Sequence, residues 1–152
     1  MKIIIILSIL SILSMLFAFS IPKPYQRYID THLHKAKMLQ HSTGVPVSIQ
    51  FAQAIYESGA GRSPLARKTN NHFGISCGDN WLGEEYHSNR CWRKYKNVGL
   101  SFVDHACYLQ NNYPDLCFKE WDKWDRLEGY CCRGYWKKIK GIIERYKLYK
   151  LD

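Results

Sequence analysis

Glu57 is the acidic residue whose position in the chain best suits acid catalysis. It lies near the end of an apolar segment that begins after Pro46 and is interrupted by the glycine-containing run 58–61. Proline is tolerated at a helix start, where a missing N–H costs nothing, and glycine favours a helix end, so we predict a short helix with Glu57 on its last turn. That end of a helix carries partial negative charge, which disfavours a second negative charge beside it.

Apolar neighbours strengthen this expectation. Phe51, Ile55 and Tyr56 are close in sequence and would keep water away from the carboxyl group, so we expect the pKa of Glu57 to be raised. An acid that keeps its proton near neutral pH can donate it to a departing sugar oxygen, which is the general-acid half of glycoside hydrolysis. The alternative is a solvated helix-end glutamate, or one paired with a neighbouring arginine, because glutamates are usually exposed.

Several short runs spread over residues 45–150 fit one pattern. They are Gln53-Ala54-x-x-Glu57-Ser58-Gly59-x-Gly61-x-Ser63, Leu65-Ala66, Asn71-x-Phe73-Gly74-Ile75, Cys91-Trp92-Arg93-Lys94-Tyr95, Ser101-Phe102-x-Asp104-His105, Leu109, Gly129-Tyr130 and the segment from Ile139 to Tyr149. In these runs the chain resembles the endo-β-N-acetylglucosaminidases of bacterial cell-wall hydrolysis, glycoside hydrolase family 73. The resemblance implies hydrolysis of β-1,4 linkages in peptidoglycan, on the reducing side of N-acetylglucosamine, with Glu57 as the general acid.

A glycosidase usually needs a second carboxylate opposite the acid. Related enzymes commonly supply it from the region that corresponds to residues 75–96, where turn signals predict a small hairpin lobe. In characterised relatives the second carboxylate tends to lie further along, where this chain has no acid. Glu84 and Glu85 are therefore the candidates, and alternation along a strand would place one of them on the cleft side. Asp79, or assistance from the acetamido group of the substrate, is the alternative.

Four more residues are candidates for the site. The rings of Trp81 and Tyr86 suit stacking on a sugar. The amide of Asn71 suits either a sugar contact or a structural role at the cleft floor. The resemblance places Tyr130 near the acid, although its element is shortened here and contains two cysteines. A muramidase, a lytic transglycosylase and a glycan-binding domain without hydrolytic activity are the alternative functions.

Residues 1–20 are typical of a secretory signal peptide. They contain Lys2, an apolar run and small residues before Ile21, although an uncleaved membrane anchor is the alternative. The remaining segment, 21–152, is long enough for one domain with a single core. We therefore expect an exported protein that acts in the periplasm, in the cell envelope or outside the cell.

Charge and composition narrow the expected partners. The formal net charge of +9 suits contact with anionic surfaces such as bacterial wall polymers. No nucleic-acid-binding motif is present, so the expected partner is the glycan strand of peptidoglycan, bound by a monomer. His32, His34 and His41 lack a matching carboxylate or cysteine cluster, so we expect neither a metal site nor an organic cofactor.

All six cysteines follow the helix that ends near Glu57: Cys77, Cys91, Cys107, Cys117, Cys131 and Cys132. An even number behind a signal segment favours disulfides. We predict a Cys77–Cys91 bond, because these residues flank a loop of hairpin size. The other four are expected to pair among themselves, with Cys131 and Cys132 each reaching back to Cys107 or Cys117.

Hydrophobic periodicity predicts a mostly α (α+β) fold, and the resemblance implies a lysozyme-like helical domain with a small β-hairpin lobe. Helices are expected over residues 25–40, 47–57, 64–68, 101–111 and 134–149, with a further short helix near Trp124. Ser101 and Asp104 have the spacing of a capping box at the start of the fourth helix.

Overall fold

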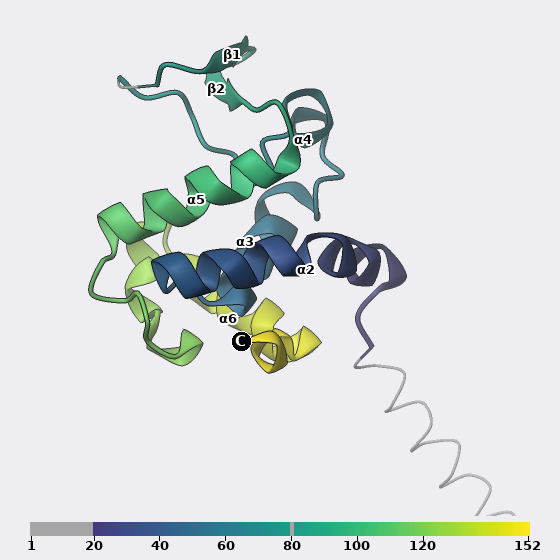
Figure 1. Ribbon diagram of the computed structural model, residues 1–152, viewed down its shortest axis with the longest axis vertical. Coiled ribbons are helices and arrows are strands. Elements are labelled where there is room, and N and C mark those ends of the chain that lie inside the picture. Colours follow the sequence, from purple (N-terminus) through teal and green to yellow (C-terminus); the bar gives the residue numbers. More distant parts are fainter. Residues whose placement is uncertain (1–19, 80) are drawn as a thin grey trace, which may run out of the picture.

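The computed structural model describes residues 20–79 and 81–152 (Figure 1). The predicted signal peptide therefore lies outside the described residues, apart from Ser20. None of the helices in the described part of the chain combines the length and apolar character needed to cross a membrane.

The structure is mostly helical with one two-stranded sheet, which confirms the predicted fold class. Its elements in chain order are α2 (Lys23–Thr43), α3 (Val47–Ser58), α4 (Pro64–Thr69), β1 (Glu84–His87), β2 (Cys91–Lys94), α5 (Val98–Asn112), the 3-10 helices η1 (Trp121–Lys123) and η2 (Asp125–Gly129), α6 (Tyr135–Tyr146) and η3 (Leu148–Leu151). Figure 1 shows the hairpin β1–β2 standing apart from the helices, beyond α4 and α5.

Helix α3 is the centre of the core. All its residues from 47 to 55 are buried, as expected for a helix that is apolar on nearly every side. It packs against α2, α6 and η3. Ser48, Gln50 and Gln53 are buried polar residues of α3 that bond to other parts of the chain: Gln50 Nε2, for example, donates to the carbonyl oxygens of Ala36 and Val45 at 3.1 and 3.0 Å. The helix that carries Glu57 is thus fixed on several sides.

The predicted capping box on α5 is wrong. The helix begins at Val98, and the Asn97 side chain caps it by accepting the N–H of Leu100 at 3.1 Å. Ser101 is buried inside the helix, where its Oγ accepts the N–H of His72 at 3.2 Å. Both residues of the predicted capping box make tertiary contacts instead, because Asp104 bonds to Arg93 of β2.

The lobe is an antiparallel hairpin in which Glu84 lies opposite Lys94 and Glu85 opposite Arg93. The predicted disulfide between Cys77 and Cys91 is confirmed, with a Cα–Cα distance of 5.5 Å. It closes the lobe across the hairpin.

The predicted pairing of the other four cysteines is wrong, because Cys107, Cys117, Cys131 and Cys132 are free thiols. The Cys107 thiol is exposed on the outer side of α5. The Cys117 thiol donates instead to the carbonyl oxygen of Tyr113, 3.6 Å away, within its own turn. Neither Cys107 nor Cys117 is therefore bonded to Cys131 or Cys132.

Candidate active site

Glu57 lies on the last turn of α3, as predicted. The helix ends at Gly59, whose left-handed backbone (φ +59°) directs its N–H to the carbonyl oxygen of Ile55 at 2.9 Å. Glu57 is half-buried. Within the described residues, no lysine, arginine or histidine nitrogen lies within 4.0 Å of its carboxylate. The arginine-paired alternative therefore does not describe this side chain.

A chain of two hydrogen bonds orients the Glu57 carboxyl group. Tyr135, the first residue of α6, donates its hydroxyl to Glu57 Oε1 at 2.8 Å. Gln53, one turn before Glu57, donates its Nε2 to the same hydroxyl at 3.0 Å. The hydroxyl has a single hydrogen and its oxygen already accepts from Gln53, so that hydrogen points at Oε1. The proton of a protonated Glu57 therefore resides on Oε2, the other oxygen.

The pKa of Glu57 is raised, in the direction predicted from the sequence. Burial is the larger cause, and the hydrogen bond from Tyr135 opposes it by favouring the charged form. Glu57 Oε2 faces Gly74, where an added Cβ would lie 3.8 Å away. The backbone of Gly74 is itself left-handed (φ +62°), a conformation that glycine adopts at little cost. Glycine at this position therefore adds no side chain in front of the proton-carrying oxygen.

Tyr130 belongs to the same cluster. Its ring stacks on that of Tyr135, with centroids 5.1 Å apart, and meets the ring of Tyr108 edge-on at 5.7 Å. Burial raises the pKa of Tyr130, and the nearby Glu57 carboxylate raises it further. Its hydroxyl therefore stays protonated beside the acid over the physiological pH range. The structure brings Tyr130 and Glu57 into one neighbourhood through Tyr135.

Asn71 is a structural residue in this geometry. Its side chain is buried, and its Nδ2 donates to the carbonyl oxygens of Ile75 and Arg93 at 2.8 and 2.9 Å. Its Oδ1 accepts the N–H of Ile75 at 3.0 Å. Both donors are used on backbone groups at the base of the lobe, so the structural alternative fits Asn71 and the sugar-contact interpretation does not.

The two lobe glutamates lie on opposite faces of the hairpin, because side chains alternate along a strand. Glu84 is exposed and paired with Lys94 at 2.8 Å, and hydrogen bonding to that ammonium group lowers the pKa of Glu84. Glu85 is paired with His87 at 2.8 Å. Glu85 shares its face with Arg93, which lies opposite it in the register.

Arg93 ties that face of the lobe to α5. Its guanidinium donates to both carboxylate oxygens of Asp104 at 2.9 and 2.8 Å, and the Tyr95 hydroxyl donates to Asp104 Oδ2 at 2.6 Å. Both contacts come from Nη1, while Nε donates to the carbonyl oxygen of Ser76 at 3.0 Å, so the guanidinium is held at two points. One turn further along α5, Tyr108 contacts Tyr130. Helix α5 thus connects the lobe face that carries Glu85 with the aromatic rings beside Glu57.

The remaining aromatic candidates pack mainly on the lobe itself. The Trp81 indole N–H donates to the carbonyl oxygen of Glu84 at 3.0 Å, and the Arg93 guanidinium lies 4.7 Å from the ring. The Tyr86 hydroxyl lies 3.4 Å from Lys68 Nζ, on the side of α4. The structure therefore places Trp81 and Tyr86 on different sides of the hairpin.

The Cys77, Glu85 and Cys91 side chains have a spacing that could suit a metal ion. The two sulfur atoms are bonded to each other, however, and a metal would need them as free thiolates. This cluster is a disulfide with a neighbouring carboxylate.

Tyr135 and Gln53 are the site residues that sequence reasoning missed. Tyr135 reads as one member of the apolar stripe of α6, and nothing local indicates that its hydroxyl reaches Glu57, 78 residues away in the chain. Gln53 gave a usable signal, because it lies four residues before Glu57, on the same helix face, in an otherwise apolar segment.

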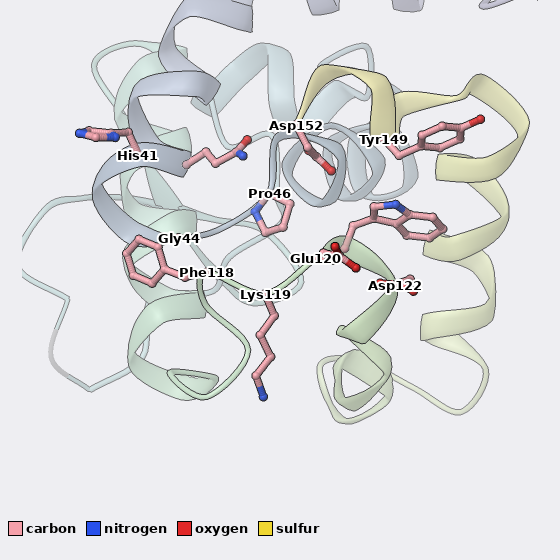
Figure 2. Close-up of a pocket in the computed structure, with 11 residues that line it drawn as sticks. His41, Gly44, Pro46, Phe118, Lys119, Glu120, Asp122, Tyr149 and Asp152 are labelled. Carbon is pink, nitrogen blue, oxygen red and sulfur yellow. The ribbon is translucent and has the colours of Figure 1, made fainter.

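A hollow of about 660 Å³ lies at the other end of α3 (Figure 2). Pro46 and Asp152 line it, and the Asp152 carboxylate accepts the N–H and hydroxyl of Ser48 at 2.8 and 2.7 Å. A carboxylate at a helix N-terminus satisfies free N–H groups and the helix dipole. A 12-residue helix is about 18 Å long, so this hollow is separate from Glu57.

Comparison with known proteins finds relatives that are similar in sequence and in fold. The exo-glucosaminidase LytG of Bacillus subtilis is 30% identical over 84% of this chain and 53% of its own length, so the chain spans about half of that relative. The catalytic domain of the autolysin Auto from Listeria monocytogenes superposes with a TM-score of 0.71 at 26% identity, covering 88% of this chain and 90% of that domain. A peptidoglycan hydrolase from Sphingomonas sp. A1 gives 0.68 at 27% identity, covering 83% and 92%.

The family model described as glucosaminidase, mannosyl-glycoprotein endo-β-N-acetylglucosaminidase, matches residues 33–148. The match includes Glu57, Tyr135, the lobe and α5, which together form the arrangement described above. This chain therefore belongs to the glucosaminidase family.

Proposed function

We propose that this protein is a peptidoglycan hydrolase, an endo-β-N-acetylglucosaminidase that cleaves β-1,4 bonds on the reducing side of N-acetylglucosamine. The observation that carries the proposal is Glu57, an acid half-buried at a helix end, with a raised pKa and one oxygen fixed by Tyr135. Family membership and the peptidoglycan hydrolase from Sphingomonas sp. A1 support the substrate class.

In this mechanism Glu57 Oε2 gives its proton to the leaving sugar oxygen. Burial keeps the proton in place before the reaction, and the Tyr135 hydroxyl stabilises the carboxylate that the transfer leaves behind. Positive charge develops on the sugar in the transition state. Tyr130, whose ring stacks on that of Tyr135, is our candidate to contribute an oxygen lone pair near that charge while its own proton is retained.

Glu85 is our candidate for the second carboxylate. It shares a hairpin face with Arg93, which is bonded to α5, whereas Glu84 shares the other face with Tyr86. The side-chain partner of Glu85 is an exposed histidine, 2.8 Å away, so substrate can displace this contact at little cost. Assistance by the acetamido group of the substrate is the alternative, and it predicts that Glu85→Gln leaves activity intact.

We further propose that the protein is exported through residues 1–20 and acts as a monomer on glycan strands. The net charge of +9 supports contact with the anionic polymers of the cell envelope. The substrate class supports an extracytoplasmic location, because peptidoglycan lies outside the cytoplasmic membrane.

The test is digestion of purified peptidoglycan by the wild type and Glu57→Gln. We expect the variant to lose activity by a factor of about 100 or more, because general acid catalysis contributes about 10²–10⁴. Glu120→Gln, an exposed glutamate outside this cluster, is the matched control. Unchanged lysis by Glu57→Gln would remove the enzyme hypothesis.

Mass spectrometry of the products identifies the bond that is cut. N-acetylglucosamine at the new reducing ends supports the proposed activity, whereas reducing or anhydro muramic acid ends indicate a muramidase or a lytic transglycosylase. Release of single sugars from chain ends would distinguish exo from endo action.

A further inference from the structure

A second hollow, of about 540 Å³, lies against α6, and Tyr56 in its wall meets the ring of Tyr135, the hydrogen-bond partner of Glu57, edge-on at 5.4 Å. Its walls include Tyr56 from α3 and Lys138 and Arg145 from α6. Tyr56 directly precedes Glu57, and Tyr135, the hydrogen-bond partner of Glu57, is the first residue of α6. The two helices that position the acid therefore also form this hollow, which we call the α6 hollow.

The α6 hollow is cationic. Lys137, Lys138 and Arg145 line it, and within the described residues none of the three has a carboxylate within 4.0 Å. Lys138 Nζ donates to the Tyr56 hydroxyl at 2.8 Å and lies 5.2 Å from the centre of that ring. A neutral partner fixes the ammonium group without neutralising it, so all three charges are available to a ligand.

The cations are spaced along the hollow. Lys138 and Arg145 are seven residues apart, which places them on one face of α6 at a separation of about 10 Å along the axis. Tyr25 and Tyr146 pack edge-on at its far end, with ring centroids 5.8 Å apart. This geometry suits an extended chain with more than one anionic group, running away from Glu57.

Gly141 lies in the α6 hollow between these cations. Glycine is unfavourable in a helix interior, and usually has a packing reason when it occurs there. Packing gives none here, because a Cβ built at Gly141 meets no atom within 4 Å. The effect of the missing side chain is to leave the hollow open between Lys138 and Arg145.

We propose that the α6 hollow binds the carboxylate groups of the peptide stems that branch from a peptidoglycan strand. The inference rests on the proposed function. Stem peptides carry free carboxylates and are attached to the sugar next to the cleaved bond, so a strand held at Glu57 brings them close to α6. Recognition of this kind makes the stem-bearing strand a better substrate than an uncharged glycan of the same backbone.

The test compares Lys137→Gln/Arg145→Gln with the wild type on two substrates, stem-bearing glycan strands and uncharged β-1,4 oligomers of N-acetylglucosamine. We expect kcat/KM on the strands to fall about tenfold, as for the loss of two partly exposed charge contacts, and to stay within about twofold on the oligomers. Lys119→Gln/Lys150→Gln, which removes the same charge outside the α6 hollow, should behave as the wild type. An equal loss on both substrates, or an equal loss in the control, would overturn the proposal.

Chemical amidation of the stem carboxylates identifies the ligand. Wild-type cleavage of amidated strands should fall to the rate of the double variant. No effect of amidation overturns the proposal. The proposal is also overturned if the difference between wild type and double variant disappears when phosphodiester polymers are removed from the walls, because the bound groups would then be phosphates.

Two further measurements separate failure of the proposal from other failures. If the wild type cleaves neither substrate, the proposed function fails, but titration calorimetry with stem-bearing strands still tests binding in the α6 hollow. About tenfold weaker binding by the double variant supports the α6 proposal, and equal binding overturns it. Gly141→Leu fills the hollow with a residue that favours helix. Its thermal midpoint should equal or exceed that of the wild type while cleavage of strands falls; unchanged cleavage contradicts the proposal.

Discussion

The surroundings of Glu57 and the hairpin lobe differ in how their polar groups are buried and paired. Around Glu57 the groups come from α3 and α6, are largely buried, and form one chain of hydrogen bonds from Gln53 through Tyr135. In the lobe the acids are exposed and paired with exposed neighbours, as Glu84 is with Lys94. Burial raises the pKa of Glu57 and favours its protonated form, whereas the lobe acids can exchange partners when a substrate arrives.

The two regions are also held in place differently. The core around α3 is continuous with α2 and α6, so packing fixes the helix that carries Glu57, and the Tyr135 hydroxyl orients its carboxyl group. None of residues 81–94 of the lobe is buried, and ties to the rest of the chain hold it: the Cys77–Cys91 bond, the Asn71 bonds at its base and the pair of Arg93 with Asp104. A few covalent and polar ties therefore decide how the lobe faces the acid.

The largest expected effect distinguishes Glu85 from Glu84 as the second carboxylate. Glu85→Gln should lower the turnover of peptidoglycan by a factor of about 100 or more if Glu85 is the second carboxylate. Glu84→Gln is the matched control and should keep most activity, because Glu84 lies on the other hairpin face. Steady-state turnover of soluble glycan strands measures both. The reverse result would move the second role to Glu84, and no loss in either would favour acetamido assistance.

Removal of the Cys77–Cys91 disulfide is expected to have the next largest effect. Cys77→Ser/Cys91→Ser opens a loop with a sequence separation of 14, so we expect a loss of about 3 kcal/mol in the stability of the part of the chain that it closes. Activity should fall at lower urea concentrations than the helical signal, because the body does not depend on this bond. Parallel urea titrations followed by activity and circular dichroism give the measurement. Cys107→Ser, an exposed free thiol, should change neither curve.

Tyr135→Phe should have a moderate effect with a diagnostic pH signature. It removes the hydroxyl that favours the charged form of Glu57, so the pKa of Glu57 should rise further and the alkaline limb of kcat should move to higher pH. We expect kcat at the optimum to fall about tenfold, because the carboxyl group loses its orienting bond. Tyr130→Phe leaves that bond intact, so its alkaline limb should stay in place. An unshifted limb in Tyr135→Phe would contradict the assigned role.

The effect expected to be smallest at neutral pH concerns acid stability. His105 is fully buried against Phe73, and burial lowers its pKa to about 3. The folded state keeps it neutral while the unfolded chain takes up a proton below pH about 6.5, so its contribution to stability is present above that pH and is lost as pH falls toward 3. Each pH unit in this window costs about 1.4 kcal/mol.

Urea unfolding at pH 7, 6, 5 and 4 tests this dependence. His105→Gln should flatten the decline relative to wild type, whereas His34→Gln, an exposed histidine, should not. His72, whose pKa burial lowers to about 4, should leave a residual slope in the variant. Equal slopes in wild type and His105→Gln would show that His105 does not titrate in this range.

The sequence by itself determined the helices, the end of α3 at Gly59 and the direction of the Glu57 pKa shift, because these depend on residues within a few positions of one another. It also indicated the Cys77–Cys91 bond, which spans a single hairpin. Only the tertiary structure decided that Tyr135 fixes the acid, that Asn71 is consumed by backbone groups and that Asp104 binds Arg93. The Glu57–Tyr135 contact joins residues 78 positions apart, and Asn71 and Arg93, which is 22 positions further along the chain, join different elements. Local propensity carries no information about which surfaces of different elements will pack together.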